Sequence, residues 1–299
     1  MITYIESILL GLLQGVTELF PISSLGHSVL FAWLFGWNNI LKSQSSQGSF
    51  FLAYLVLLHV ATATALLIFY RKQWIRIISG FFSSLKKRKA ENSNEKLAWL
   101  IIVATIPAGL FGLIFEHSLR TQFAKPLSAA VFIIVNGFIL LTGDWYMKNH
   151  HMKQPKRDYM LETSAKHTSS KMSFRNAVLI GTAQIFALFA GISRSGITIL
   201  GGLFSGLDYE DAARFSFLLA TPIILAAGLL KLPDVFGPLA DGVRPQMIVG
   251  AIVAGFSAYF TVRFLDKYFR TKTLRPFAIY CIAIGVFSLV IGISGIRPF

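Results

Sequence analysis

Residues 11–30 read GLLQGVTELFPISSLGHSVL, and residues 181–200 read GTAQIFALFAGISRSGITIL. These stretches are two copies of one motif, because they align without a gap at a constant offset of 170. The identical pairs are Gly11 and Gly181, Gln14 and Gln184, Ile22 and Ile192, Ser23 and Ser193, Gly26 and Gly196, and Leu30 and Leu200. Each copy places ionisable side chains in the middle of an apolar run. Such groups are costly inside a membrane, so they usually mark a function and a partner.

The composition indicates an all-α, polytopic membrane protein. Hydrophobic residues make up 54% of the 299 residues and charged residues only 14%, which is too apolar for a soluble domain. The single cysteine, Cys281, excludes an internal disulfide and a cysteine-based metal site. The net charge of +14 does not indicate a nucleic-acid partner, because no nucleic-acid-binding motif accompanies it.

The apolar segments predict six membrane spans and two shorter, broken regions. Regions 2–36 and 176–206 are interrupted at Pro21–Ser24 and Gly191–Gly196, and each half is too short to cross the bilayer alone. We therefore expect two re-entrant hairpins, whose irregular tips are buried in protein or face a wet cavity. The six expected spans are 49–70, 98–116, 126–147, 212–231, 246–262 and 276–295.

The basic residues predict how these segments are oriented. Of the 28 Lys and Arg residues, 20 lie in segments 71–97, 148–175 and 263–275, which is the pattern of cytoplasmic loops. With all three segments inside, the first hairpin dips from the outer face and the second from the inner face, as in an inverted-topology repeat. The chain is then one integral-membrane domain, with repeat 1 at about 1–147, a basic inside loop at about 148–175, and repeat 2 at about 176–299.

The first copy contains the titratable groups. Gln14 and Glu18 are four residues apart, so one helical face presents both. Glu18 and His27 can move protons or hold a metal ion. Glu18 can also be a structural partner for a buried arginine, and Gln14 and Gln184 can simply bond to neighbouring helices. His59, in the span 49–70, is more often a histidine satisfied within the bundle than a ligand.

The two tips together resemble a phosphate site. A new helix is expected to begin at Ser23 or Ser24, where its free N–H groups favour an anion, and Gly26 would let a ligand approach the backbone. The second tip opens another short helix with Ser193, Arg194, Ser195 and Gly196, and Arg194 offers a planar fork for phosphate oxygens. The alternative for Ser23 and Ser193 is a capping role alone.

At these residues the chain resembles the undecaprenyl-diphosphate phosphatase family, known from bacitracin resistance. The resemblance rests on Gln14-Gly-Val-Thr-Glu18, on Pro21-Ile-Ser-Ser-Leu-Gly-His27, and on Ala190-Gly-Ile-Ser-Arg-Ser-Gly196, where the family has Pro in place of Ala190. Further matching stretches are Ala104–Ala108 and Ala213–Ala220.

The resemblance implies a metal-assisted phosphatase that removes the terminal phosphate from a C55 isoprenoid diphosphate and so recycles a carrier lipid for cell-wall synthesis. It implies a multi-pass protein of the bacterial cytoplasmic (inner) membrane, with an active site open to the outer, periplasmic face. Glu18, Ser24, His27 and Arg194 would be catalytic. Ser23, Ser193, Ser195, Gly26 and Gly196 would join Arg194 in binding phosphate, and Glu18 with Gln14 would hold Mg²⁺ or Ca²⁺. A second copy of the chain, in a homodimer, is a further partner that we consider.

Two questions stay open at this point. The attacking group can be Ser24, His27, or water positioned by Glu18. In addition, inverted repeats with broken helices are typical of transporters, so a flippase for the polyprenyl phosphate lipid is the alternative function.

Overall fold

The computed structural model describes residues 2–37, 40, 50–123, 125–149 and 161–297, and its regular secondary structure in these ranges is all helical. The first half contains α1 (Tyr4–Thr17), α2 (Ser24–Leu34), α4 (Phe50–Phe69), α5 (Arg71–Lys87), α6 (Ser93–Phe123) and α7 (Pro126–Asn149). The second half contains α8 (Leu161–Lys171), α9 (Phe174–Ala183), η1 (Gln184–Leu188), α10 (Arg194–Phe204), α11 (Tyr209–Phe236), η2 (Pro238–Ala240), α12 (Arg244–Tyr268) and α13 (Arg275–Ile293). The all-α bundle predicted from the sequence is therefore confirmed.

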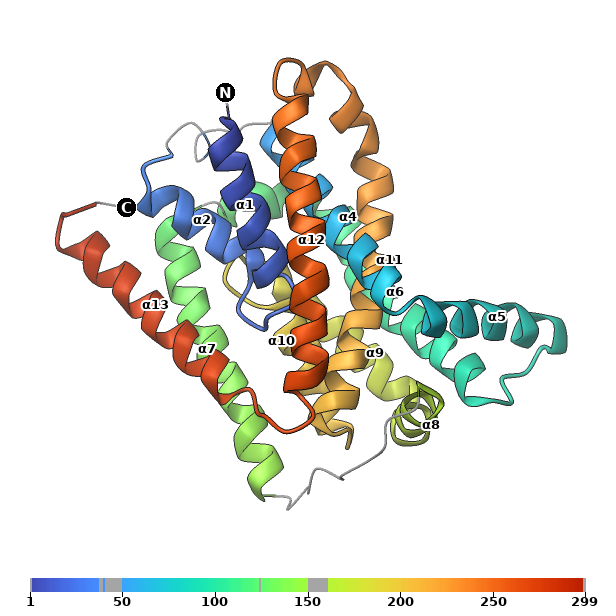
Figure 1. Cartoon of the computed structure of the whole chain (residues 1–299). Coiled ribbons are helices and arrows are strands. Elements are labelled where there is room, and N and C mark those ends of the chain that lie inside the picture. The colour runs from blue at the N-terminus through green and yellow to red at the C-terminus, as the bar shows by residue number, and fades with distance from the viewer. Residues whose placement is uncertain (1, 38–39, 41–49, 124, 150–160, 298–299) are drawn as a thin grey trace.

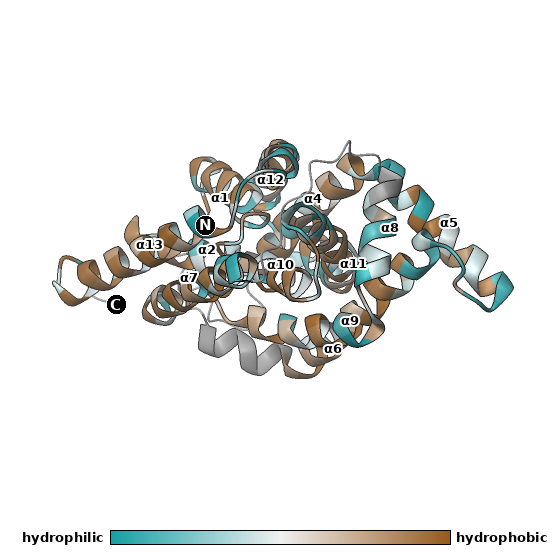
Figure 2. Ribbon diagram, turned by 90° about the horizontal axis from the view of Figure 1, so that it is seen from below, coloured by the Kyte–Doolittle hydropathy of each residue, from teal (hydrophilic) through white to brown (hydrophobic). Residues whose placement is uncertain are grey.

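Six helices of the described chain are long and apolar enough to cross a membrane. They are Phe51–Phe69, Ser93–Phe115, Pro126–Asn149, Tyr209–Lys231, Arg244–Tyr268 and Arg275–Ile293, which match the six expected spans. Apolar side chains remain exposed on their outer faces, as Ile252, Phe256 and Phe260 do at four-residue spacing on α12. Figure 2 shows the apolar colouring of the outer helices. A stripe of this kind suits contact with lipid.

The two broken regions form helix–break–helix hairpins where the sequence predicts them. In the first, α1 ends at Thr17 and α2 begins at Ser24; in the second, α9 and the short η1 end at Leu188 and α10 begins at Arg194. Thr3 and Glu6 form a capping box that starts α1, and Ser173 caps α9 by accepting from the Asn176 N–H at 3.1 Å.

Each hairpin is packed against a helix of the other half of the chain. A Cβ atom added at Gly11 in α1 would lie 2.3 Å from the Gly250 carbonyl oxygen of α12. At the paired position, a Cβ atom added at Gly181 in α9 would lie 2.5 Å from the Ala104 carbonyl oxygen of α6. The duplicated glycines thus serve equivalent close helix contacts, as expected of small residues in membrane interfaces.

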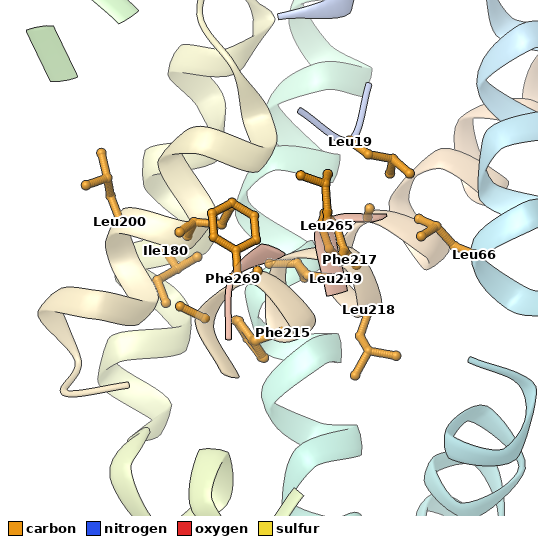
Figure 3. Packing of buried hydrophobic residues seen from close by; sticks show 14 of the residues in the cluster. Leu19, Leu66, Ile180, Leu200, Phe215, Phe217, Leu218, Leu219, Leu265 and Phe269 are labelled. Carbon is orange, nitrogen blue, oxygen red and sulfur yellow. The ribbon is translucent and has the colours of Figure 1, made fainter. Parts of the chain in front are cut away.

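The connections between the long helices lie at two opposite ends of the molecule. Figure 1 shows the start of α1 and the α11–α12 connection at one end of the molecule, and the α12–α13 connection and the end of α7 at the other end. Of the six spans, α11 has the largest buried share. Figure 3 shows the core around it, with Phe215, Phe217 and Leu219 from α11 close to Leu265 of α12 and to Phe269, the residue that follows α12.

Two helices lie in segments that the sequence analysis treated as basic loops. Residues 71–87 form α5, and residues 161–171 form α8. His167 of α8 contacts the buried Asp211 at the start of α11, and Ser164 donates to the same carboxylate at 2.6 Å. Polar contacts to α11 therefore hold part of this basic segment against the bundle. His150 and His151 lie outside the described residues.

Candidate active site

The two hairpin tips meet through one ion pair. Arg194 Nη2, at the start of α10, lies 2.7 Å from Glu18 Oε1, just beyond the end of α1. The Glu18 side chain is 6% exposed and the Arg194 side chain 16% exposed, so the pair is largely shielded. The two tips, which the sequence predicts to form one phosphate site, are therefore in direct contact at these two residues.

The other carboxylate oxygen of Glu18 accepts from several side chains. Ser24 Oγ donates to Oε2 at 2.5 Å, and Gln14 Nε2 donates to it at 3.1 Å. The Gln14 contact follows from the four-residue spacing along α1. The Ser24 contact requires the turn at Pro21, which brings the first residue of α2 back to the end of α1. Glu18 and Ser24 thus have the arrangement of a base and a nucleophile.

His59 is the third side chain on this oxygen. His59 Nε2 of α4 lies 3.2 Å from Glu18 Oε2, and Nδ1 lies 2.7 Å from the Leu55 carbonyl oxygen. Carbonyl and carboxylate oxygens only accept, so both ring nitrogens can donate here only when the imidazole is protonated. His59 then adds a second positive charge beside Glu18. From the sequence, His59 was expected to have a structural role, and the signal for another role was an ionisable side chain within an apolar span.

Ser23 joins the two tips. It has a positive φ of 73°, and its Oγ accepts from the Gly26 N–H at 3.3 Å and from the Gly191 N–H at 3.1 Å. A Cβ atom added at Gly26 would lie 2.8 Å from the Gly191 nitrogen. The strained serine and the small Gly26 therefore allow the tips to pack backbone against backbone.

The serines of the second tip have similar contacts. Ser193 Oγ accepts from the Gly196 N–H at 3.1 Å and lies 3.0 Å from Ser195 Oγ. Ser195 Oγ also lies 3.1 Å from the Phe20 carbonyl oxygen in the first tip, to which it donates. A Cβ atom added at Gly196 would lie 3.1 Å from the Leu140 side chain. These contacts give Ser193 a capping role and Gly196 a packing role; phosphate binding by this group stays a prediction.

Asn136 cross-links the tips from α7. Its Nδ2 donates to the Pro21 carbonyl oxygen at 2.9 Å, and its Oδ1 accepts from the Ser193 N–H at 2.9 Å. The side chain is fully buried. Breaks in a helix leave backbone groups without partners, and one amide here satisfies a group in each break. Asn136 was not predicted from the sequence, although a single amide side chain within the apolar span 126–147 could have indicated a polar contact inside the bundle.

His27 is fully buried and has a partner at each ring nitrogen. Nδ1 lies 2.7 Å from the Ser23 carbonyl oxygen, and Nε2 lies 3.1 Å from the Tyr280 hydroxyl of α13. The two rings also stack, with centroids 5.6 Å apart. Because Nδ1 donates to the carbonyl, Nε2 accepts from Tyr280 in the neutral imidazole. Tyr280 is a second residue that sequence reasoning missed.

Comparisons with known proteins identify the family. Residues 7–287 match the family described as bacitracin resistance protein BacA. The chain belongs to the BacA family. It is 49% identical to the undecaprenyl-diphosphatase of Mycolicibacterium paratuberculosis, with 97% of each chain covered. It is also 46% identical to undecaprenyl-diphosphatase 2 of Frankia alni, covering 97% of this chain and 98% of the relative.

Two buried polar atoms of this BacA family chain have no hydrogen-bond partner among the described residues and belong to the site. They are Arg194 Nη1 and Gln14 Oε1. Burying a polar group without a partner is unfavourable, by about 1–3 kcal/mol. The site of the BacA chain therefore has a donor and an acceptor available to a ligand.

An apolar groove lies beside the site of the BacA chain. It has a volume of about 660 Å³ between α1, α2 and α13. Thr17, Phe20 and Tyr280 line it near the hairpin tip, and Phe35 and Trp37 line it beyond the end of α2. The hydroxyl that bonds to His27 thus belongs to a side chain that also lines the groove. An isoprenoid chain is a suitable occupant of such a surface.

Proposed function

We propose that this protein hydrolyses undecaprenyl diphosphate to undecaprenyl phosphate and inorganic phosphate, and so supports bacitracin resistance. The proposal rests on membership of the BacA family and on relatives named undecaprenyl-diphosphatase over nearly the whole chain. The observation that carries the chemistry is the contact of Glu18 with Arg194 on one carboxylate oxygen and with Ser24 on the other.

Ser24 is the nucleophile that this geometry favours. Its hydroxyl already donates to Glu18 Oε2 at 2.5 Å, so Glu18 takes the proton as Ser24 Oγ bonds to the terminal phosphorus. The bond between that phosphorus and the bridging oxygen breaks, and undecaprenyl phosphate leaves. Glu18 passes the proton to the departing phosphate oxygen and so returns to its carboxylate form. It then takes a proton from water, whose oxygen bonds to the phosphorus while the bond from phosphorus to Ser24 Oγ breaks. Ser24 regains a proton from Glu18, and inorganic phosphate is released. His27 is less suited to attack, because both of its nitrogens are engaged.

Arg194 would bind the diphosphate and stabilise the charge that develops in the reaction. Its Nη2 holds Glu18, while its Nη1 is buried and available. A protonated His59 would add a second positive charge next to the carboxylate. Donors fixed in advance around a phosphate are the usual source of catalysis in phosphoryl transfer.

A divalent cation, Mg²⁺ or Ca²⁺, is part of the proposal. Glu18 and Gln14 would hold it, and the donor set fits, since the buried Gln14 Oε1 has no partner among the described residues and Gln14 Nε2 contacts Glu18. When bound, the cation supplies electrostatic stabilisation of the phosphate oxygens.

We place the protein in the bacterial cytoplasmic (inner) membrane with the site open to the outer face. The positive-inside pattern supports this orientation, because the basic connections lie at the end opposite the start of α1. A homodimer stays part of the proposal, to be tested by the mass of the protein in detergent.

The deciding experiment measures phosphate release by the purified protein in detergent, where no two compartments exist for transport. We expect hydrolysis of the isoprenoid diphosphate with Mg²⁺ or Ca²⁺ present and loss of activity in EDTA. Transient ³²P labelling from the terminal phosphate should map to Ser24 and be absent in Ser24→Ala. Absence of phosphate release with intact folding would leave the flippase, which the names of the relatives do not favour.

A further inference from the structure

Helix α5 divides into three faces. The buried face carries Gln73, Ile77, Gly80 and Ser84, and it packs on α6, where Trp99 Nε1 donates to Ser84 Oγ at 2.9 Å. A Cβ atom added at Gly80 would lie 3.0 Å from the Glu95 nitrogen. One side of α5 is therefore fixed against the bundle, and its orientation is set.

The second face is apolar and exposed. Ile75, Ile78, Phe82 and Leu85 are 68%, 49%, 63% and 47% exposed, respectively. Their spacing of three, four and three residues places them on one stripe of a helix. Exposed large apolar side chains in a continuous stripe need a covering partner.

The third face is basic. Lys72, Arg76 and Lys86 are exposed, and no described acidic side chain forms an ion pair with them. At 100° per residue they lie on a stripe beside the apolar one, together with Ser79 and Ser83. The helix itself contains five basic residues and no acidic one.

The position of α5 in the molecule indicates that its exposed faces contact the membrane surface. Figure 1 shows α5 running across the direction of α12 and projecting from the side of the bundle. It follows α4 directly, since α4 ends at Phe69 and α5 begins at Arg71. A helix that turns sideways at the end of a span lies along the membrane surface. With an apolar stripe beside a basic stripe, it has the pattern of an interfacial helix.

We propose that α5 lies in the membrane interface and binds anionic phospholipid. Ile75, Ile78, Phe82 and Leu85 enter the acyl-chain region of the leaflet at the basic end of the molecule. Lys72, Arg76 and Lys86 contact phosphate headgroups, because negative surface charge attracts a cluster of basic side chains next to a membrane span. This inference is independent of the proposed hydrolysis, since it uses no residue of the site.

The test uses the fact that the only cysteine, Cys281, is buried. A fluorescent label on Phe82→Cys, in vesicles of phosphatidylcholine, reports quenching by lipids with brominated acyl chains and by aqueous iodide. A label on Phe256→Cys, 66% exposed on the outer face of α12, serves as the lipid-facing control. Unlabelled wild type controls for background reaction.

We expect the label at residue 82 to be quenched by brominated lipid and protected from iodide. Brominated phosphatidylglycerol should give half-maximal quenching at a mole fraction at least several-fold lower than brominated phosphatidylcholine. The triple variant Lys72→Gln, Arg76→Gln, Lys86→Gln should remove that difference. The matched triple Arg263→Gln, Lys267→Gln, Lys272→Gln, at the end of α12, should keep it, because the label reports only nearby lipid.

Three results would overturn the proposal. Quenching by iodide at residue 82 would place the apolar stripe in water. Equal quenching by the two brominated lipids would remove the anionic preference. Retention of the preference in the first triple variant would assign it to other residues.

Discussion

Replacing Arg194 tests whether the meeting of the two tips makes the phosphate site. Arg194→Ala removes Nη2 from Glu18 and removes the buried Nη1 that has no partner among the described residues. Losing one fixed donor to a developing phosphate charge is worth about 2.7–4 kcal/mol, so turnover should fall by roughly 10² to 10³. Breaking a buried ion pair also destabilises folding, by about 3–5 kcal/mol. We expect the lower end of that range, because His59 still contacts Glu18.

The assay follows phosphate release at saturating lipid diphosphate, corrected for the folded fraction by thermal unfolding in detergent. Arg194→Lys should recover part of the stability and little of the turnover, because an ammonium group cannot replace the planar fork. Arg214→Ala is the matched control. Arg214 is buried, and its Nη2 donates to Asp266 Oδ1 at 3.0 Å and to Glu210 Oε1 at 3.4 Å. Its loss should therefore lower stability, while the protein that remains folded keeps its turnover. Near-wild-type turnover in Arg194→Ala would refute a phosphate site at this arginine.

Three further changes probe the surroundings of the pair. His59→Ala should reduce turnover by roughly tenfold to a hundredfold, which corresponds to the loss of one charge-assisted hydrogen bond. His59→Gln should restore much of the lost turnover if donation to Glu18 is what matters. Equal loss of turnover in both variants would contradict a positioning role based on donation alone. Asn136→Ala leaves the Pro21 carbonyl and the Ser193 N–H unsatisfied, which should lower the free energy of unfolding by about 1–3 kcal/mol for each group. The midpoint of thermal unfolding should therefore fall, with Asn136→Leu as the isosteric comparison. An unchanged midpoint would show that other groups hold the tips together. Tyr280→Phe keeps the ring but removes the hydroxyl that bonds to His27. Turnover should change by less than about tenfold, since a neutral hydrogen bond contributes about 0.5–1.5 kcal/mol. Complete inactivation would instead indicate that the hydroxyl takes part in the reaction.

The local pattern of the chain was sufficient to predict the architecture. Six spans and two breaks follow from apolar length, from Pro21, and from the cluster Gly191–Gly196, because the bilayer allows few alternatives for an interrupted apolar segment. The duplicated motif also predicted that the two tips form one site, since an inverted repeat brings equivalent breaks together.

The neighbours of the site could not be predicted in the same way. Whether His59, Asn136 and Tyr280 face the tips depends on how α4, α7 and α13 are rotated about their own axes. That rotation is set by close packing between helices, and hydropathy along one strongly apolar span hardly records it. The same limit applies to α5, whose buried face exists only because α6 lies against it.

The order in which the ribosome makes the chain gives the Arg194–Glu18 pair one more consequence. The two residues are separated by 176 positions. Gly250, against which Gly11 packs closely, is synthesised later still. Before Arg194 is made, Glu18 has only His59, Ser24 and Gln14 from the first half of the chain as partners, and an incompletely paired carboxylate is unfavourable at membrane depth. The first hairpin therefore has little reason to settle at its final depth while only the first half of the chain has been synthesised. We expect the first hairpin to stay near the membrane surface and to insert fully when the second hairpin arrives, so that the candidate active site is completed as one of the last steps of assembly.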